Sequence, residues 1–372
     1  MSNPFWPEDG VSLRNEALDR LLMWCSDQDA SRIQLQTDKP IVMKVHGLNR
    51  TITREALLPG IVEDAINYMF RDTTAVTHLR QSRALDLSHT IWPDRRARRY
   101  SFRINAVPTL VGPEQAVGIT IRPLVDIPRP LAEQNVEPRL LEALEGDNGM
   151  YLVCGATGSG KTTLLGGINR RRLEDPDCHM DLVEGSAPLE LLYDLVPAVN
   201  STVMQIEIPR GLPTFAEFIR AAMRQEPTDI VVGEIRDPET AVAAIQAAIS
   251  GHRLLSSLHT FDCASTVRRI AALCPADQRD SLTISFVENL RVIVNQRLLR
   301  STDGRRTPIR EFLPVSRAFR DSLLDADPKH WPELTRKAVE TSGQSFEQSI
   351  RSAHREGRIT EAVAAAAIRQ EL

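Results

Sequence analysis

The chain has 372 residues, of which 42% are hydrophobic and 25% are charged. That composition is typical of a globular protein, and the length accommodates two domains of ordinary size. A formal net charge of -4 excludes a global positive field that would attract the chain to nucleic acid or to an acidic membrane surface. Any site for a polyanion therefore has to be local.

The cysteines and the first residues bear on the cellular compartment. The five cysteines include no C-x-x-C spacing, which predicts neither a disulfide framework nor a zinc site, and we expect them to be buried. No apolar run reaches the length of about 18 residues that a membrane-spanning helix needs. The start MSNPFWPEDG lacks the basic and apolar regions of a signal peptide. We expect a cytoplasmic protein, which leaves peripheral membrane attachment open.

Residues 1–122 predict a domain of mixed α and β structure. Residues 13–25 place their leucines on one helical face, and LPGIVEDAINYMF returns to helical spacing. Between these helices, SRIQLQT, PIVMKVHG and LNRTITR lie between Pro and Gly breaks, which predicts a small antiparallel sheet. ALDLSHTIW and RRYSFRINAVPT add two further strands.

An arginine cluster separates these last two strands. Arg95, Arg96, Arg98 and Arg99 follow a Pro-Asp turn in the segment PDRRARR. A solvated hairpin tip and a contact with phosphate or a partner both explain such a cluster.

A proline-rich stretch follows the first domain. Pro123, Pro128, Pro130 and Pro138 are spaced closely enough to hold the backbone extended rather than helical. We therefore expect residues 123–138 to be a linker.

The pattern after the linker predicts a second, larger domain over residues 139–300. Strands are expected near residues 150–154, 179–183, 229–233 and 254–258, and helical stretches alternate with them. Buried strands of a parallel sheet appear as continuous apolar runs, so this order predicts a wound α/β sheet.

The segment 301–372 is expected to be helical. Ser345 and Gln348 form a capping box, Gly357 can end one helix and Thr360 can cap the next. The predicted structure is a helical hairpin, and it has no catalytic signature.

The strongest motif is GATGSGKTT, which matches G-x-x-x-x-G-K-[ST] in full between an apolar strand and a helix. Its glycines let backbone N–H groups turn toward phosphates, Lys161 supplies a point charge, and the helix N-terminus adds its dipole. The Thr162 hydroxyl is expected to ligate Mg²⁺. The candidate nucleotide-binding residues are Gly155, Ala156, Thr157, Gly158, Ser159, Gly160, Lys161, Thr162 and Thr163.

Acidic residues follow two other expected strands. DIVVGEIRD delivers Glu234 to the carboxyl end of its strand, where it can hold the magnesium shell or orient the attacking water. VEGSAPLELLYD contributes Glu184 and Glu190, and we take Glu190 as the candidate general base. Because an acid at this place is often a solvated loop residue, these assignments depend on the glycine motif.

A histidine and two arginines complete the set. LLSSLHT brings His259 to a strand end, where its imidazole can sense the γ-phosphate, although a lone histidine is more often structural. FAEFIRAAMRQEP places Arg220 and Arg224 at i and i+4 on one side of a helix. The pair is either surface charge or a guanidinium contact with the transferred phosphate.

In this order and spacing, GATGSGKTT, DIVVGEIRDPETA and GHRLLSSLHT resemble the type II/IV secretion ATPases, within them the PilT-like branch. VMKVHGLNRTI and SFRINAVP resemble strands of the family's PAS-like N-terminal domain, and SFEQSIRSAHREGRIT resembles its C-terminal helices. The resemblance covers residues 15–372. It implies an α/β fold with a RecA-like P-loop ATPase domain, preceded by a smaller PAS-like α+β domain and followed by a C-terminal helical segment.

The resemblance also implies a mechanism. Family members form rings, usually hexamers, in which ATP binds between the two domains and subunits donate arginines to neighbouring sites. By motif, Glu190 matches the acid ending the Asp box, Glu234 the Walker B glutamate and His259 the His box. The arginines that match family positions are Arg103, Arg220 and Arg224.

The chain departs from the family pattern at several motifs. The E-D-P of the Asp box appears as the longer EGSAP, Q-R-E appears as QIE, and D-L-H-L appears as RIQL. These departures, with the LELLYD ending of the Asp box, resemble the DotB/TraJ ATPases of type IVB secretion and conjugation more than pilus retraction motors.

We therefore expect a hexameric cytoplasmic motor that uses ATP and Mg²⁺ and acts on inner-membrane components of a type IV secretion or conjugation apparatus. One alternative is a type IV pilus retraction motor. A second is a RecA-like nucleic-acid-dependent ATPase, but the acidic net charge and the absence of interleaved aromatics argue against direct nucleic-acid binding. A third is a nucleotide-binding scaffold with little hydrolysis, motivated by the altered Asp box.

Overall fold

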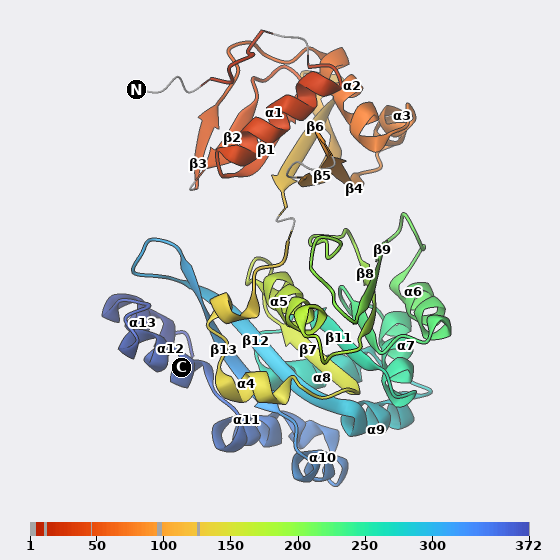
Figure 1. The fold of residues 1–372 in the computed structure, drawn as a ribbon, viewed down its shortest axis with the longest axis vertical. Helices are drawn as coiled ribbons and strands as arrows, with labels where there is room; N and C mark the ends of the chain where they lie inside the picture. The colour runs from red at the N-terminus through yellow and green to blue at the C-terminus, as the bar shows by residue number, and fades with distance from the viewer. Residues whose placement is uncertain (1–4, 11–12, 46, 95–98, 125–126, 372) are drawn as a thin grey trace. The chain divides into compact units, whose positions relative to one another are not determined.

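The computed structural model describes residues 5–10, 13–45, 47–94, 99–124 and 127–371 (Figure 1). The chain divides into two compact units, Met1–Asp126 and Ile127–Leu372. Arg95, Arg96 and Arg98 of the predicted arginine cluster lie outside the described residues, whereas Arg99 is buried.

The first unit is an antiparallel sheet with helices on one face. Its six strands follow the order β3-β2-β1-β6-β5-β4, and each neighbouring pair is antiparallel, as the sequence predicts. Buried and accessible residues alternate along β6, because only one face of the sheet meets the helices. The elements are α1 Glu16–Asp27, β1 Ala30–Gln36, β2 Val42–Val45, β3 Leu48–Thr51, α2 Pro59–Phe70, α3 Ala75–Arg80, β4 Leu85–Ile91, β5 Tyr100–Val111 and β6 Glu114–Pro123.

The second unit contains a seven-stranded sheet in the order β13-β12-β7-β11-β10-β8-β9. All neighbouring pairs are parallel except β12 and β13, which are antiparallel. The central strands β7, β10 and β11 are buried at every position, because helices cover both faces. The strands are β7 Gly149–Cys154, β8 Asp181–Ser186, β9 Thr202–Glu207, β10 Asp229–Val232, β11 Arg253–Leu258, β12 Leu290–Arg300 and β13 Arg306–Pro314.

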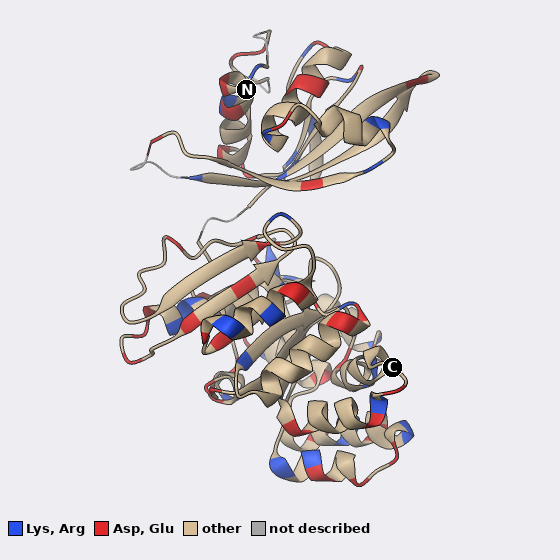
Figure 2. Cartoon of the chain, turned by 90° about the vertical axis from the view of Figure 1, so that its right-hand side faces the viewer, with Lys and Arg blue, Asp and Glu red and all other residues tan. Residues whose placement is uncertain are grey.

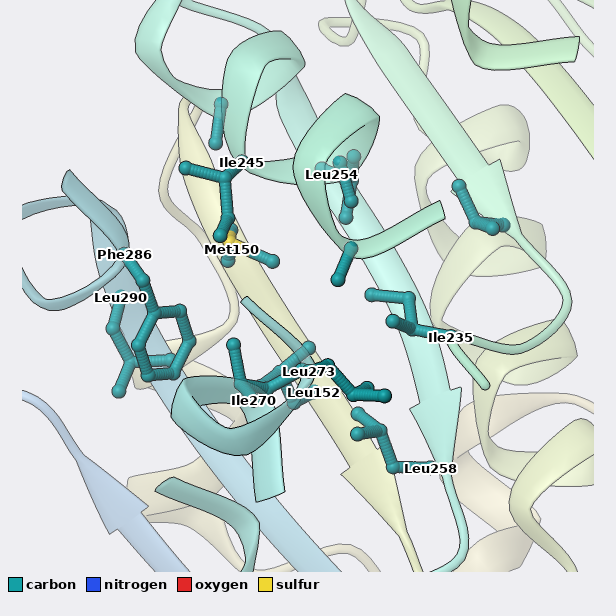
Figure 3. Packing of buried hydrophobic residues seen from close by; sticks show 14 of the residues in the cluster. Met150, Leu152, Ile235, Ile245, Leu254, Leu258, Ile270, Leu273, Phe286 and Leu290 are labelled. Carbon is teal, nitrogen blue, oxygen red and sulfur yellow. The ribbon is translucent and has the colours of Figure 1, made fainter. Parts of the chain in front are cut away.

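Apolar side chains join these strands to the helices. On one face, Met150 and Leu152 of β7 and Leu254 of β11 pack with Ile245 of α7 and Ile270 of α8 in a single cluster (Figure 3). A second cluster on the other face includes residues of α5. The helices are α4 Pro138–Ala143, α5 Lys161–Glu174, α6 Phe215–Ala222, α7 Pro238–Ile249, α8 Cys263–Leu273, α9 Arg279–Asn289, α10 Arg317–Leu324, α11 Trp331–Ser342, α12 Phe346–Arg355 and α13 Glu361–Ile368, with 3-10 turns η1 Leu131–Gln134, η2 Met223–Gln225 and η3 Pro328–His330.

Two segments differ from the sequence expectations. Residues 123–138 are not uniformly extended, because η1 forms where the prolines leave a gap and buries Leu131. Residues 301–372 are not entirely helical, because β13 pairs with β12 and completes the large sheet. The terminal hairpin itself is confirmed, with a capping box between Ser345 and Gln348 at the start of α12.

Two further expectations concern the cysteines and the membrane. All five cysteines are free and four are buried, whereas Cys178 is only partly buried, contrary to the expectation. Across the described ranges, the structure contains no helix with the length and apolarity that crossing a membrane requires.

A buried ion pair joins the first residues of β10 and β11. Arg253 and Asp229 are 0% and 1% exposed, and the Arg253 Nη1 to Asp229 Oδ1 distance is 2.7 Å. Arg253 also donates to the Leu144 carbonyl, and the Thr228 hydroxyl donates to the second carboxylate oxygen. These hydrogen bonds offset the desolvation of both charges and fix the register of the two strands.

The substitution Asp229→Ala is expected to lower the free energy of unfolding by about 3–5 kcal/mol, because it leaves the Arg253 guanidinium buried without its counter-charge. Urea unfolding of the full chain measures the loss. The control is Glu347→Ala, which removes the exposed partner of Arg351 and should cost less than about 1 kcal/mol. Equal losses for the two variants would show that the buried pair does not stabilise the sheet.

Candidate active site

The parallel register brings several strand ends to one edge of the large sheet. Cys154, the last residue of β7, lies opposite Leu258, the last residue of β11. Val232 at the end of β10 lies opposite Gly185 of β8 and Ser256 of β11. The loops that leave these strands therefore start side by side, and they carry the candidate phosphate-binding and acidic residues.

The glycine loop, residues 155–160, connects β7 to α5 and depends on its glycines. Gly155, Gly158 and Gly160 have φ values of 141°, 79° and 85°, a region that other residues rarely adopt. A Cβ atom at Gly155 would lie 2.4 Å from the carbonyl oxygen of Gln296. Gly160 is the N-cap of α5 and has no side chain to cap the first N–H groups, so these donors remain directed at the loop.

Lys161 is buried beneath this loop. Its Nζ donates hydrogen bonds to the carbonyl oxygens of Gly155 at 2.8 Å and Ala156 at 3.1 Å. Burial lowers the pKa of Lys161, while the nearby Cys154, Glu190 and Glu234 act in the opposite direction. The structure therefore places the ammonium within electrostatic reach of both predicted acids.

Glu234 and His259 meet at the ends of β10 and β11. The Glu234 Oε2 to His259 Nε2 distance is 3.6 Å, and the Arg236 Nη1 donates to Glu234 Oε1 at 3.0 Å. The His259 side chain is 50% exposed, so it is available to a ligand. The Arg236 contact was missed in the sequence, although Arg236 stands two residues after Glu234 in the same motif.

Thr162 and Glu234 supply the oxygen atoms that suit a magnesium ion. Thr162 is exposed in the first turn of α5, and Glu234 is partly buried at its strand end. The described residues include no cluster of three or more His, Cys, Asp or Glu side chains that could hold a metal by themselves. Because Mg²⁺ usually takes one or two protein ligands together with phosphate oxygens and water, this donor set fits it.

Glu184 lies on β8, and its carboxyl is buried. Its Oε1 accepts a hydrogen bond from the Ser186 hydroxyl at 2.7 Å, and its Oε2 accepts one from Gln205 Nε2 at 2.8 Å. Burial raises the pKa of Glu184 to about 7; the two hydrogen bonds oppose the increase, and the Glu190 charge adds to it. Glu190 itself lies partly buried in the loop after β8.

The predicted arginines are distributed differently. Arg220 lies in the last turn of α6, but Arg224 belongs to η2, so the two do not share one α-helix as expected. Both are exposed, and neither forms a hydrogen bond or ion pair with the described residues of its own chain. Arg103 belongs to the first unit, where it lies on β5 opposite Ser88 and Arg122.

Side chains of β12 and β13, two strands that the sequence did not predict, hold the glycine loop in place. Gln296 on β12 donates from its Nε2 to the Ser159 carbonyl oxygen at 2.8 Å. Its Oε1 accepts a hydrogen bond from Arg310 Nε at 2.8 Å, and Arg310 on β13 is 1% exposed. Arg310 also donates to the carbonyl oxygens of Gln134 and Asn135. No motif in the sequence pointed to this support.

Known proteins share this architecture. The family model of the Type II/IV secretion system protein matches residues 16–310. The X-ray structure of the Legionella pneumophila ATPase DotB is 34% identical, covers 99% of this chain and 100% of its own, and has a TM-score of 0.85. The crystal structure of the pilus retraction motor PilT with bound ADP is 25% identical, covers 94% and 96%, and has a TM-score of 0.77. The twitching motility protein of Neisseria gonorrhoeae is 30% identical over 262 residues, 69% of this chain and 67% of that protein.

The substitution Glu184→Gln is expected to change the pH dependence of stability. The pKa of Glu184 rises from 4.5 to about 7 in the folded chain, so its ionisation opposes folding. The destabilisation is absent below pH 4.5, grows between the two values and is complete above about pH 7, on the order of a few kcal/mol. The variant should therefore gain stability relative to the parent between pH 5 and pH 8.

Urea unfolding of both proteins at pH 5 and pH 8 measures this difference. The exposed substitution Glu347→Gln is the control, and its difference from the parent should stay constant with pH. A constant difference for Glu184→Gln as well would show that the buried carboxyl does not titrate in this range.

Proposed function

The chain belongs to the Type II/IV secretion system protein family and is an ATP hydrolase, and we propose that it works as a hexameric motor of a type IVB secretion or conjugation apparatus. The observation that supports the motor is the convergence of Lys161, Glu190, Glu234 and His259 at one sheet edge. The likeness to the DotB ATPase favours this assignment over pilus retraction, since both identity and TM-score exceed those for PilT.

In the proposed mechanism, the glycine loop holds the phosphates of ATP. Its backbone N–H groups and Lys161 neutralise the charge on the phosphates as water attacks the terminal phosphorus. Glu190 acts as the general base toward that water, and Glu234 orients it. Thr162 and Glu234 would hold Mg²⁺, which would supply further neutralisation of the phosphate charge. His259 contacts Glu234, so the end of β11 responds to whether the terminal phosphate is present.

The proposed ring of subunits gives the exposed arginines a role. Arg220 and Arg224 are exposed and form no hydrogen bond or ion pair with the described residues, so their guanidinium groups are available to another molecule. We assign them, with Arg103, to the sites of neighbouring subunits, where a guanidinium stabilises charge on the transferred phosphate. The motor is proposed to act in the cytoplasm on inner-membrane components of its apparatus.

Nucleic acid is not the proposed partner. Basic and acidic residues are interspersed along the helices of the second unit rather than gathered in a basic stripe (Figure 2). Binding to a phosphate backbone depends on such a stripe and weakens steeply with salt. The arginine cluster of the segment PDRRARR falls largely on residues 95–98, outside the described residues.

Lys161→Ala and Glu234→Gln are each expected to lower the ATP hydrolysis rate by at least about a hundredfold, because each removes a group that acts on the transferred phosphate or its water. Phosphate release by the assembled protein measures the rate. Lys329→Ala removes a lysine in η3 and is the control. Hydrolysis at the parental rate by either variant would contradict the proposed mechanism.

A mixing experiment tests whether the arginines act between subunits. Arg220→Ala subunits retain Lys161, and Lys161→Ala subunits retain Arg220, so mixed rings contain some complete sites. We expect each variant alone to be at least about tenfold slower than the parent and the mixture to regain activity. Light scattering on the same samples records the assembly. Full rings without regained activity would exclude donation of Arg220 between subunits.

A further inference from the structure

We propose that Glu184 and Gln205 form a buried clamp that positions the loop carrying Glu190, so that both are positioning residues for ATP hydrolysis. The inference rests on the proposed role of Glu190 as the general base. In this proposal neither side chain contacts the phosphates; both act through the loop that carries Glu190.

Within the clamp, Gln205 is the residue that contacts the loop carrying Glu190. It lies directly opposite Glu184 in the parallel pair of β8 and β9. Its Nε2 donates to Glu184 Oε2 at 2.8 Å and to the Leu191 carbonyl oxygen at 2.9 Å, and its Oε1 accepts from the Tyr193 N–H at 3.0 Å. Rotating the amide by 180° would place its oxygen against two acceptors, so only this orientation satisfies the contacts. Two of these partners, Leu191 and Tyr193, lie within three residues after Glu190 in the chain.

The other side of the loop is fixed to α5. The Tyr193 hydroxyl accepts a hydrogen bond from Asn169 Nδ2 at 3.0 Å, and both side chains are buried. A Cβ atom at Gly166 would lie 2.3 Å from Leu191 Cδ1, so the loop packs directly on the helix backbone. The loop is therefore held between β9 and the helix that begins with Lys161. This arrangement gives Glu190 a defined place relative to the lysine.

The buried carboxyl of Glu184 destabilises the fold when it ionises, but its charge strengthens the clamp. An apolar residue in this position would avoid the cost of desolvating a carboxyl. Glu184 instead places a carboxyl in a buried site where only two side chains donate hydrogen bonds to it. An ionised carboxylate strengthens the bond from Gln205, because charge-assisted hydrogen bonds are stronger than neutral ones. When Glu184 is protonated, the Ser186 hydroxyl can turn to accept a hydrogen bond from the carboxyl O–H, but the Gln205 bond loses the assistance of the charge.

The clamp therefore predicts a pH dependence. The ionisable group that acts on Glu184 is Glu190 in the loop. Glu184 in turn raises the pKa of Tyr193, which also belongs to the loop. Ionisation of Glu184 tightens the Gln205 contact and adds negative charge near Glu190, and both effects favour proton removal from water. The turnover rate of the parent should rise with pH through about 7, where the pKa of Glu184 lies.

The test compares Glu184→Gln and Gln205→Leu with the parent as assembled full-length protein. Gln205→Leu should lower kcat at least about tenfold while KM for ATP and the affinity for ADP stay within about twofold, because the glycine loop is unchanged. Glu184→Gln should lose the rise of kcat between pH 6 and pH 8. It should also be more stable and less active than the parent at pH 8, a combination that a purely structural role does not produce.

The matched control is Thr202→Val, which removes a side-chain hydrogen bond between the same two strands, to Asp181 at their other end. It should leave kcat unchanged. Parallel losses of kcat and ADP affinity, or an unchanged pH profile in Glu184→Gln, would overturn the clamp. Glu190→Gln separates the two proposals: if it hydrolyses ATP normally, the assignment of the base fails, whatever the clamp variants show.

Discussion

The candidate site depends on one constraint, the parallel register of β7, β8, β10 and β11. Parallel strands deliver their carboxyl ends to the same edge, so segments far apart in the chain meet there without long loops. The register places the glycine loop, the Glu190 loop, Glu234 and His259 in neighbouring positions. A slip of one residue in any of these strands would turn its side chains to the other face and separate the acids from Lys161.

The C-terminal strands take part in the same site. Arg310 is buried on β13 and has its donors bound by Gln296, by two backbone carbonyls of residues 134–135 and by Glu137. Gln296 in turn holds the Ser159 carbonyl. A buried guanidinium is tolerated only when such bonds satisfy it, so the glycine loop and the beginning of the second unit are fixed by one polar network.

The sequence predicted those features that depend on local pattern and missed those that depend on pairing. The glycine loop, the strand before it and the terminal hairpin follow from short motifs with their own physical signatures. β13 was missed because two adjacent charged residues, Arg310 and Glu311, interrupt its apolar run although both have partners inside the unit. The pattern supplied both Glu184 and Glu190, but the partner of Glu184 is Gln205, a residue on another strand that only the register reveals.

The two ends of the sheet carry opposite contributions to stability. At one end, Asp229 and Arg253 form a buried ion pair that resists separation of β10 from β11. At the other end, Glu184 and Lys161 are buried, and burial shifts both pKa values toward the neutral forms, so their charged forms oppose folding. A lysine that is to bind phosphate cannot also be fully neutralised by the fold. The ion pair at one end of the strands therefore offsets the cost of the buried charges at the other end, where the chemistry is proposed to occur.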